Sequence, residues 1–178
     1  MTSTQWFVLL IAAVSVERIV ELILSQRHVR WALERGGVEV GRGHYPAMVV
    51  LHVGLLVGSL VEVLLLGRAF YPWLGWPMLL GVICAQSLRW WCIRTLGPQW
   101  NTRVVVVPGA RRVTSGPYRL LRHPNYLAVV VEGVCLPLVH TAWITASVFS
   151  LCNGFLLRVR VREEDRALQM LAPTAVVR

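Results

Sequence analysis

Residues 46–66 read PAMVVLHVGLLVGSLVEVLLL, an apolar run in which His52 and Glu62 are the only ionisable side chains. A helix needs about 20 mostly apolar residues to cross the hydrocarbon core of a bilayer. This run therefore predicts a membrane-spanning helix, and it places the chain among membrane proteins.

Four further runs on either side of this one have the composition of spanning helices. They cover about residues 4–24, 71–92, 125–139 and 141–157. The last two are short and nearly continuous, so we expect a tight helical hairpin around residues 137–141. The predicted fold class is an all-α membrane protein of about five transmembrane helices. It forms one domain, 1–178, with three helices in 1–92 and a long loop, the hairpin and a C-terminal helix in 93–178.

The composition agrees with a membrane protein and excludes several kinds of chemistry. Of the 178 residues, 56% are hydrophobic and 15% are charged, whereas soluble domains average about 25% charged. All 18 basic residues are Arg, which excludes a Lys nucleophile and a Walker A phosphate loop. None of the cysteines forms a CxxC pair, so we expect buried thiols and no metal site. They are Cys84, Cys92, Cys135 and Cys152.

The net charge of +9 is distributed as in a polytopic membrane protein. Arg residues gather in segments 25–45, 93–124 and 158–178, and the alternate connections are poor in them. Because cytoplasmic loops carry the excess of Arg, we expect the amino end outside and the carboxyl end in the cytoplasm. We expect no nucleic-acid binding.

A β-like run at 104–107, closed by Pro108-Gly109, predicts a folded cytoplasmic loop.

Several ionisable residues fall within the predicted spans. Glu17, Arg18 and Glu21 lie toward the end of the first. There they are expected to join neighbouring helices close to the membrane surface, where long side chains reach water at small cost. The alternative is a polar pocket. For His52 and Glu62 both interpretations stay open.

Two clusters in the second half carry the functional signal. Residues 115–127 read SGPYRLLRHPNYL. The residue before a proline avoids the α region and proline suits a first helical turn, so His123 is expected at a helix N-terminus, a seat for an anionic group. Tyr118 and Tyr126 can flank a planar ring.

The second cluster lies near the carboxyl end. Residues 158–166 read RVRVREEDR and place Arg160 and Glu164 on one helix face. Alone, such a run is typical of a solvated helix.

Together these clusters resemble the isoprenylcysteine carboxyl methyltransferase family, integral membrane enzymes that use S-adenosylmethionine. The resemblance covers about residues 94–168 and keeps the order and spacing of the family's motifs. The first half is similar to bacterial members encoded near type III polyketide synthases.

The resemblance implies a cofactor pocket between the long loop, the start of the fourth helix and the C-terminal helix. It implies substrate binding and catalysis by Arg160 and Glu164, one helical turn apart. The residues implied for cofactor binding are Pro117, Tyr118, His123, Pro124, Tyr126 and Leu127, with Glu163 or Glu164 for a polar cofactor group.

The expected function is O-methylation of a lipophilic acceptor, a carboxylate or an acidic enol or phenol reached from the bilayer. The expected location is a bacterial inner membrane, with the active site facing the cytoplasm. Alternatives are a prenylcysteine carboxyl methyltransferase, a phospholipid N-methyltransferase, an NADPH-dependent sterol-type reductase and a non-enzymatic membrane scaffold.

Overall fold

In the computed structural model the chain forms five long helices. The described residues are 2–40, 43, 45–110 and 113–171, the last five by their backbone alone. Each predicted span corresponds to one helix, and the predicted hairpin is the short connection between the last two. The helices are α1 (Ser3–Leu33), α2 (Tyr45–Leu65), α3 (Pro72–Leu96), α4 (Pro124–Leu138) and α5 (Trp143–Leu171).

Two helices are longer than the apolar runs that predicted them. α1 continues beyond residue 24 to Leu33, and α5 continues beyond residue 157 to Leu171. The predicted C-terminal helix is therefore the second half of α5 and not a separate element. Hydropathy locates the apolar part of a helix, whereas the backbone hydrogen bonds continue into the charged part.

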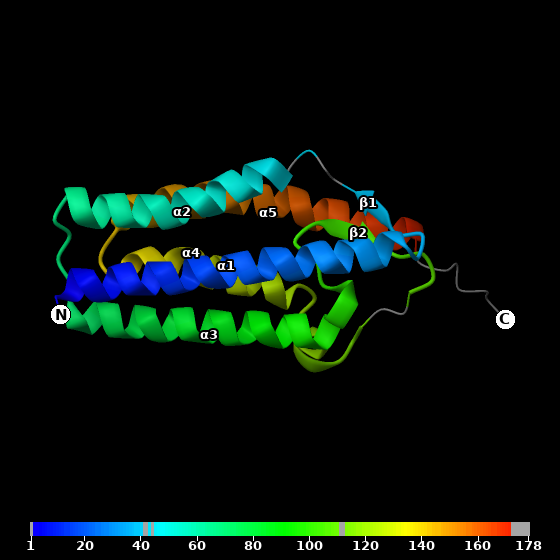
Figure 1. The fold of residues 1–178 in the computed structure, drawn as a ribbon, viewed down its shortest axis with the longest axis horizontal. Helices are drawn as coiled ribbons and strands as arrows, with labels where there is room; N and C mark the ends of the chain where they lie inside the picture. The colour runs from blue at the N-terminus through cyan, green and yellow to red at the C-terminus, as the bar shows by residue number, and fades with distance from the viewer. Residues whose placement is uncertain (1, 41–42, 44, 111–112, 172–178) are drawn as a thin grey trace.

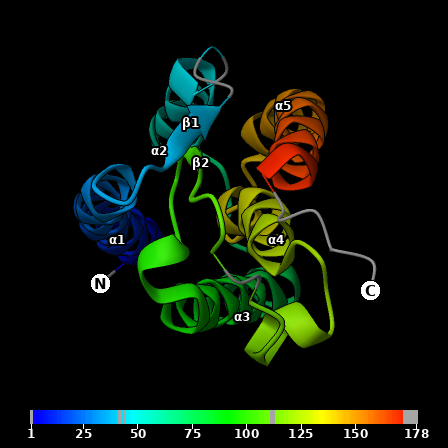
Figure 2. The same ribbon diagram turned by 90° about the vertical axis from the view of Figure 1, so that its right-hand side faces the viewer.

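The helices run alternately along one long axis (Figures 1 and 2). The C-terminal ends of α1, α3 and α5 lie with the N-terminal ends of α2 and α4 at the end where the two strands sit. The segments rich in Arg consequently meet at that end. Arg42, Arg111 and Arg112, three of the Arg residues assigned to these segments, lie outside the described residues.

A two-stranded antiparallel sheet closes this end of the bundle. Strand β2 (Val104–Val106) was expected as an isolated β-like run, but it pairs with β1 (Val38–Val40), so that Glu39 lies opposite Val105. The first strand was not predicted, because a three-residue strand has too few residues to show an alternating pattern.

Glycine lets the helices that carry the site approach closely. A Cβ atom on Gly133 of α4 would lie 2.0 Å from the Phe149 ring of α5, and one on Gly81 of α3 would lie 2.6 Å from Cys135 Sγ. A side chain at either position would therefore push α4 away from a neighbour. The apolar core lies between the helices and includes Phe7, Ile11, Leu55, Val82, Leu136 and Phe149.

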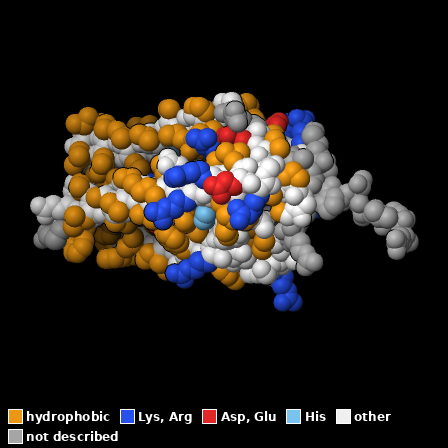
Figure 3. Space-filling view, turned by 45° about the vertical axis from the view of Figure 1, so that its right-hand side comes forward, with side chains coloured by type: hydrophobic (Ala, Val, Ile, Leu, Met, Phe, Trp, Pro, Cys, Tyr) orange, Lys and Arg blue, Asp and Glu red, His pale blue; other side chains and the backbone are white. Residues whose placement is uncertain are grey.

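Large apolar side chains are exposed on all five helices. Figure 3 shows them covering the part of the molecule away from the strands, while charged side chains gather toward the other end. Soluble monomers rarely expose apolar patches of this extent. Two helices, α2 and α5 over Trp143–Arg166, are long and apolar enough to cross a membrane. Exposed Trp side chains near one end resemble an aromatic belt: Trp6, Trp73, Trp76 and Trp143.

The exposure of the cysteines differs from the expectation. Cys92 is buried and Cys135 partly buried, but Cys84 and Cys152 are exposed. The prediction of four buried thiols is wrong for these two. Apolar surroundings in the sequence indicate a core position in a soluble protein, but here they also describe the outer surface of the bundle.

Glu17, Arg18 and Glu21 of α1 contact neighbouring helices inside the bundle, as expected from the sequence. Arg18 pairs with Glu21 at 2.7 Å, and Arg89 of α3 pairs with Glu132 of α4 and lies 3.5 Å from Glu21. Glu21 is only 3% exposed. Because α1 continues to Leu33, Glu21 is not near a helix end. Pairing with buried guanidinium groups, not access to water, keeps these carboxylates stable.

Glu62 has a structural role that the sequence left open. Its carboxylate accepts hydrogen bonds from the backbone amides of Ile144 and Thr145, at 3.1 and 2.7 Å, and pairs with Arg68 at 2.8 Å. It thus caps the N-terminus of α5 from a neighbouring helix. The other ionisable residue of α2, His52, donates to the Met48 carbonyl.

Candidate active site

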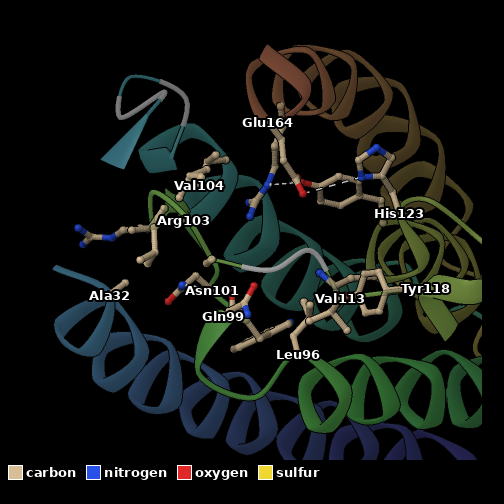
Figure 4. Close-up of a pocket in the computed structure, with 18 of the residues that line it drawn as sticks. Ala32, Leu96, Gln99, Asn101, Arg103, Val104, Val113, Tyr118, His123 and Glu164 are labelled. Carbon is tan, nitrogen blue, oxygen red and sulfur yellow. Dashed lines mark hydrogen bonds and ion pairs between the residues drawn. The ribbon is translucent and has the colours of Figure 1, made fainter. Parts of the chain in front are cut away.

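A cavity of about 490 Å³ opens at the strand end of the bundle (Figure 4). Its volume lies in the range typical of small-molecule sites. β2 forms one wall, and the start of α4 and the second half of α5 form the opposite one. The end of α1 and the segment after the 3-10 helix η2 (Gly97–Gln99) complete it. Lining residues include Trp31, Ala32, Gln99, Trp100, Asn101, Val104, Tyr118, His123, Asn125, Tyr126, Arg160 and Glu164.

A tyrosine hydroxyl joins the two α5 residues singled out by the sequence. Arg160 Nε donates to the Tyr126 hydroxyl at 3.0 Å, and that hydroxyl donates in turn to the Glu164 carboxylate. Arg160 and Glu164 are four residues apart on α5, so both reach toward the first turn of α4. The guanidinium carbon lies 5.4 Å from the centre of the Tyr126 ring.

Arg160 is a buried cation with weak partners. It is 6% exposed, and its Nη1 donates to the Met48 thioether sulfur at 3.3 Å, a poor acceptor. No carboxylate of the described chain forms an ion pair with it. Buried charges are ordinarily paired, so Arg160 has the environment of a group that meets an anionic ligand.

His123 directly precedes α4, as Pro124 predicted. Its ring stacks on Tyr126, with the ring centres 5.3 Å apart. Nδ1 lies 3.9 Å from Glu164 Oε1, and Nε2 lies 3.5 Å from Asp165 Oδ1. Carboxylates of this chain therefore already face the N-terminus of α4. A ligand group beside His123 would meet negative charge there, which suits a cation better than the anion that the sequence suggested.

Tyr118 lies in the second 3-10 helix, η3 (Gly116–Arg119). Burial raises the pKa of its phenol, and hydrogen bonding with Cys92 acts in the same direction. The hydroxyl therefore stays protonated. Gly116 starts the turn at φ 56°, with its Cα beside Thr95 and Trp91 of α3, so η3 is held against that helix.

Four of the residues implied by the resemblance lie outside the cavity lining. Pro117 and Pro124 are buried, and the Pro117 carbonyl accepts from the amides of Leu120 and Leu121. Leu127 is 44% exposed on the outside of α4. Glu163 pairs with Arg166 at 3.3 Å, so the carboxylate at the cavity is that of Glu164.

Other lining residues had no assigned role in the sequence. Trp100 Nε1, Asn101 Oδ1 and Asn125 Oδ1 are buried atoms without a hydrogen-bond partner in the described part of the chain. His28 of α1 holds this segment by donating from Nδ1 to the Trp100 carbonyl at 2.7 Å. The segment has no helical or strand period, so the sequence offers no pattern that would place it in a cavity. Unpaired buried polar atoms are uncommon, and here they face a cavity.

Comparison with known proteins agrees with the resemblance. The model of the isoprenylcysteine carboxyl methyltransferase family matches residues 77–170. An uncharacterized protein of Bacillus subtilis, YpbQ, is 38% identical over 92% of this chain and 96% of its own length. An uncharacterized protein of Haemophilus influenzae is 25% identical over 91% of this chain and 94% of its own length. The match spans the α3–α5 part of the bundle and so contains most of the cavity wall. On its sequence, this chain belongs to the isoprenylcysteine carboxyl methyltransferase family.

Proposed function

We propose that the protein is a membrane methyltransferase that uses S-adenosylmethionine to methylate an acidic oxygen of a lipophilic acceptor. The observation that carries the proposal is Arg160, a buried guanidinium at the cavity with no ion-pair partner in the described chain. Family membership implies the methyl transfer, and the unpaired cation favours an acceptor that is anionic.

The cavity residues fit the cofactor. S-adenosylmethionine supplies a methyl group on a positively charged sulfur. Trp100 Nε1 can donate to the cofactor, and the side-chain oxygens of Asn101 and Asn125 can accept from its amino and hydroxyl groups. The Glu164 carboxylate suits the positive charge of the sulfonium. The Tyr126 ring is faced by the His123 ring, which stacks on it, and by the Arg160 guanidinium.

Arg160 would orient the acceptor. Methyl transfer from a sulfonium is an in-line displacement, so the alignment of the attacking oxygen matters more than a strong base. An anionic oxygen bound to Arg160 needs no deprotonation. Arg160 Nε already donates to the Tyr126 hydroxyl, which in turn donates to Glu164, so more negative charge would remain on the attacking oxygen than beside a fully free guanidinium.

The acceptor we favour is a lipid-like small molecule, such as a long-chain alkylpyrone or alkylresorcinol hydroxyl. The exposed apolar faces of the helices support entry from the bilayer. The exclusive use of Arg suggests a GC-rich bacterial genome, in which a prenylcysteine carboxylate is not the expected substrate. A phospholipid amine suits the site less, because its positive charge would face Arg160. The arrangement supports a cell-membrane location with the cavity on the cytoplasmic side.

Ligand binding tests the enzyme class. Purified protein in detergent is titrated separately with labelled S-adenosylmethionine and NADPH. We expect S-adenosylmethionine alone to bind, and His123→Ala to weaken it about tenfold through the loss of one stacked ring at the site. NADPH binding in its place would favour the reductase alternative, and binding of neither would favour a scaffold.

Turnover tests the acceptor. Labelled methyl transfer is measured to a long-chain alkylpyrone, an alkylresorcinol, a prenylcysteine analogue and phosphatidylethanolamine. We expect product from an acidic oxygen acceptor. Methylation of the amine alone would contradict the role given to Arg160.

A further inference from the structure

A second pocket of about 300 Å³ lies beside the cavity, between α1, the start of α2 and residues 102–103, which directly precede β2. Three residues with hydroxyl groups line it, Ser25, Tyr45 and Thr102. Ser25 Oγ lies 2.8 Å from Thr102 Oγ1 and accepts from the Thr102 amide at 3.0 Å. The Tyr45 hydroxyl lies 3.4 Å from Thr102 Oγ1. The proposed methyl transfer uses none of these groups, and hydroxyls can donate to phosphate oxygens.

Two guanidinium groups line the same pocket. Arg103 lies over the Tyr45 ring at 4.9 Å and 3.4 Å from the Glu39 carboxylate. Figure 4 shows Arg103 pointing away from Glu164, and thus away from the centre of the cavity. Arg30 is exposed and forms no ion pair within the described chain. α2 also begins at Tyr45, so its partial positive charge adds to both cations.

The surroundings of the pocket are apolar on the bundle side. Leu22 and Val29 line it together with the polar groups. Beyond it, α1 and α2 expose apolar side chains, with Val50 as much as 70% exposed. A ligand for this place therefore combines an anionic group with an apolar chain. These exposed side chains include Ile19, Ile23, Val50, Val53 and Val57.

We propose that this pocket binds the phosphate headgroup of an anionic phospholipid, whose acyl chains lie along α1 and α2. Guanidinium and hydroxyl groups together are suited to phosphate oxygens. Arg103 lines both the pocket and the cavity, so a bound headgroup also stabilises β2 as a wall of the cavity. The proposal does not depend on which acceptor is methylated at Arg160.

Lipid binding to the full chain tests the site. Purified protein in a neutral detergent is titrated with phosphatidylglycerol or phosphatidylcholine, and bound lipid is counted by native mass spectrometry. We expect tighter binding of phosphatidylglycerol. Arg30→Gln should weaken it about tenfold by removing a charge-assisted contact. The matched control is Arg27→Gln, also exposed on α1 but outside the pocket lining, which should change the affinity less than about twofold.

Two further measurements distinguish a lipid headgroup from free inorganic phosphate as the ligand. Thr102→Val removes one of the hydroxyl groups that line the pocket without changing its charge, and it should also lower the affinity for phosphatidylglycerol. Millimolar inorganic phosphate should not displace the lipid. Displacement by inorganic phosphate would overturn the assignment to a lipid. Equal losses in Arg30→Gln and Arg27→Gln would show attraction by general surface charge and would also overturn it.

Discussion

At the scale of single residues, Tyr126 determines how the charges at the cavity are arranged. Its hydroxyl separates the Arg160 guanidinium from the Glu164 carboxylate while bonding to both. A direct ion pair would neutralise Arg160 and leave little for a ligand. The intervening hydroxyl keeps the two oppositely charged groups apart, which leaves the cation available for the proposed anionic acceptor and the carboxylate close to His123.

Arg160→Gln tests this division of roles. We expect kcat for methyl transfer to fall about hundredfold or more, as for the loss of one preorganised electrostatic contact. The affinity for S-adenosylmethionine should stay within about threefold, because the aromatic residues remain. Steady-state kinetics and calorimetry measure the two quantities. Arg158→Gln, an exposed Arg on the same helix, is the control, and equal losses in both variants would contradict the role.

The sequence identified most of these residues but not their surroundings. Motif spacing indicated His123, Tyr126, Arg160 and Glu164, and the cavity brings all four together. Met48 could not be found in the same way, since it lies in an apolar run 112 positions from Arg160. A methionine there is typical of any membrane helix. Only helix packing shows that its sulfur contacts a guanidinium.

At the scale of elements, ionisable side chains set how the helices meet. Glu62 of α2 caps α5, and Arg89 of α3 joins Glu21 of α1 to Glu132 of α4. α4 carries Tyr126 of the cavity, and α5 carries Arg160 and Glu164. These contacts in the middle of the bundle therefore hold α4 and α5 in the positions that bring their side chains to the cavity.

Removing the cap should loosen α5. Glu62→Ala leaves the amides of Ile144 and Thr145 without their acceptor, and we expect a loss of roughly 3 kcal/mol in the free energy of unfolding. Denaturant titration in detergent measures it. Glu34→Ala, at an exposed carboxylate, should stay within about 0.5 kcal/mol of the parent protein. A comparable loss in both would exclude the capping role.

A double-mutant cycle tests the pairing of Arg89 with Glu132. Each single replacement by Met leaves an unbalanced buried charge and should cost about 3–5 kcal/mol. The double replacement removes both charges and should recover most of that loss. The same denaturant titration applies, and simple addition of the two single losses would show that the residues are not coupled.

At the scale of the whole molecule, the distribution of charge and apolar surface predicts an orientation in the membrane. The Arg-rich segments and the cavity share one end of the bundle, and apolar side chains cover most of the other part on the face that Figure 3 shows. We expect the Arg-rich end to face the cytoplasm, where the cavity would admit the proposed water-soluble cofactor.

Reporter fusions test this orientation. Alkaline phosphatase folds to an active form only outside the cytoplasm. Joined after Gly67, in the connection between α2 and α3, it should be active in a bacterial host; joined after Pro108, beyond β2, it should be inactive. A fluorescent protein at the second junction gives the complementary signal. The reverse pattern would contradict the assigned topology.

The sequence by itself determined the helical membrane fold, the apolar parts of the five helices, the Arg-rich segments and the family. Each of these depends on local composition or on spacing along the chain. The tertiary structure alone decided the pairing of β1 with β2, the burial of Arg89 and Glu132 and the contacts of Arg160. These are contacts between distant segments, and their energies depend on burial and distance, which composition does not specify. The same apolar pattern describes a core and a lipid-facing surface, so only packing could separate Cys92 from Cys84.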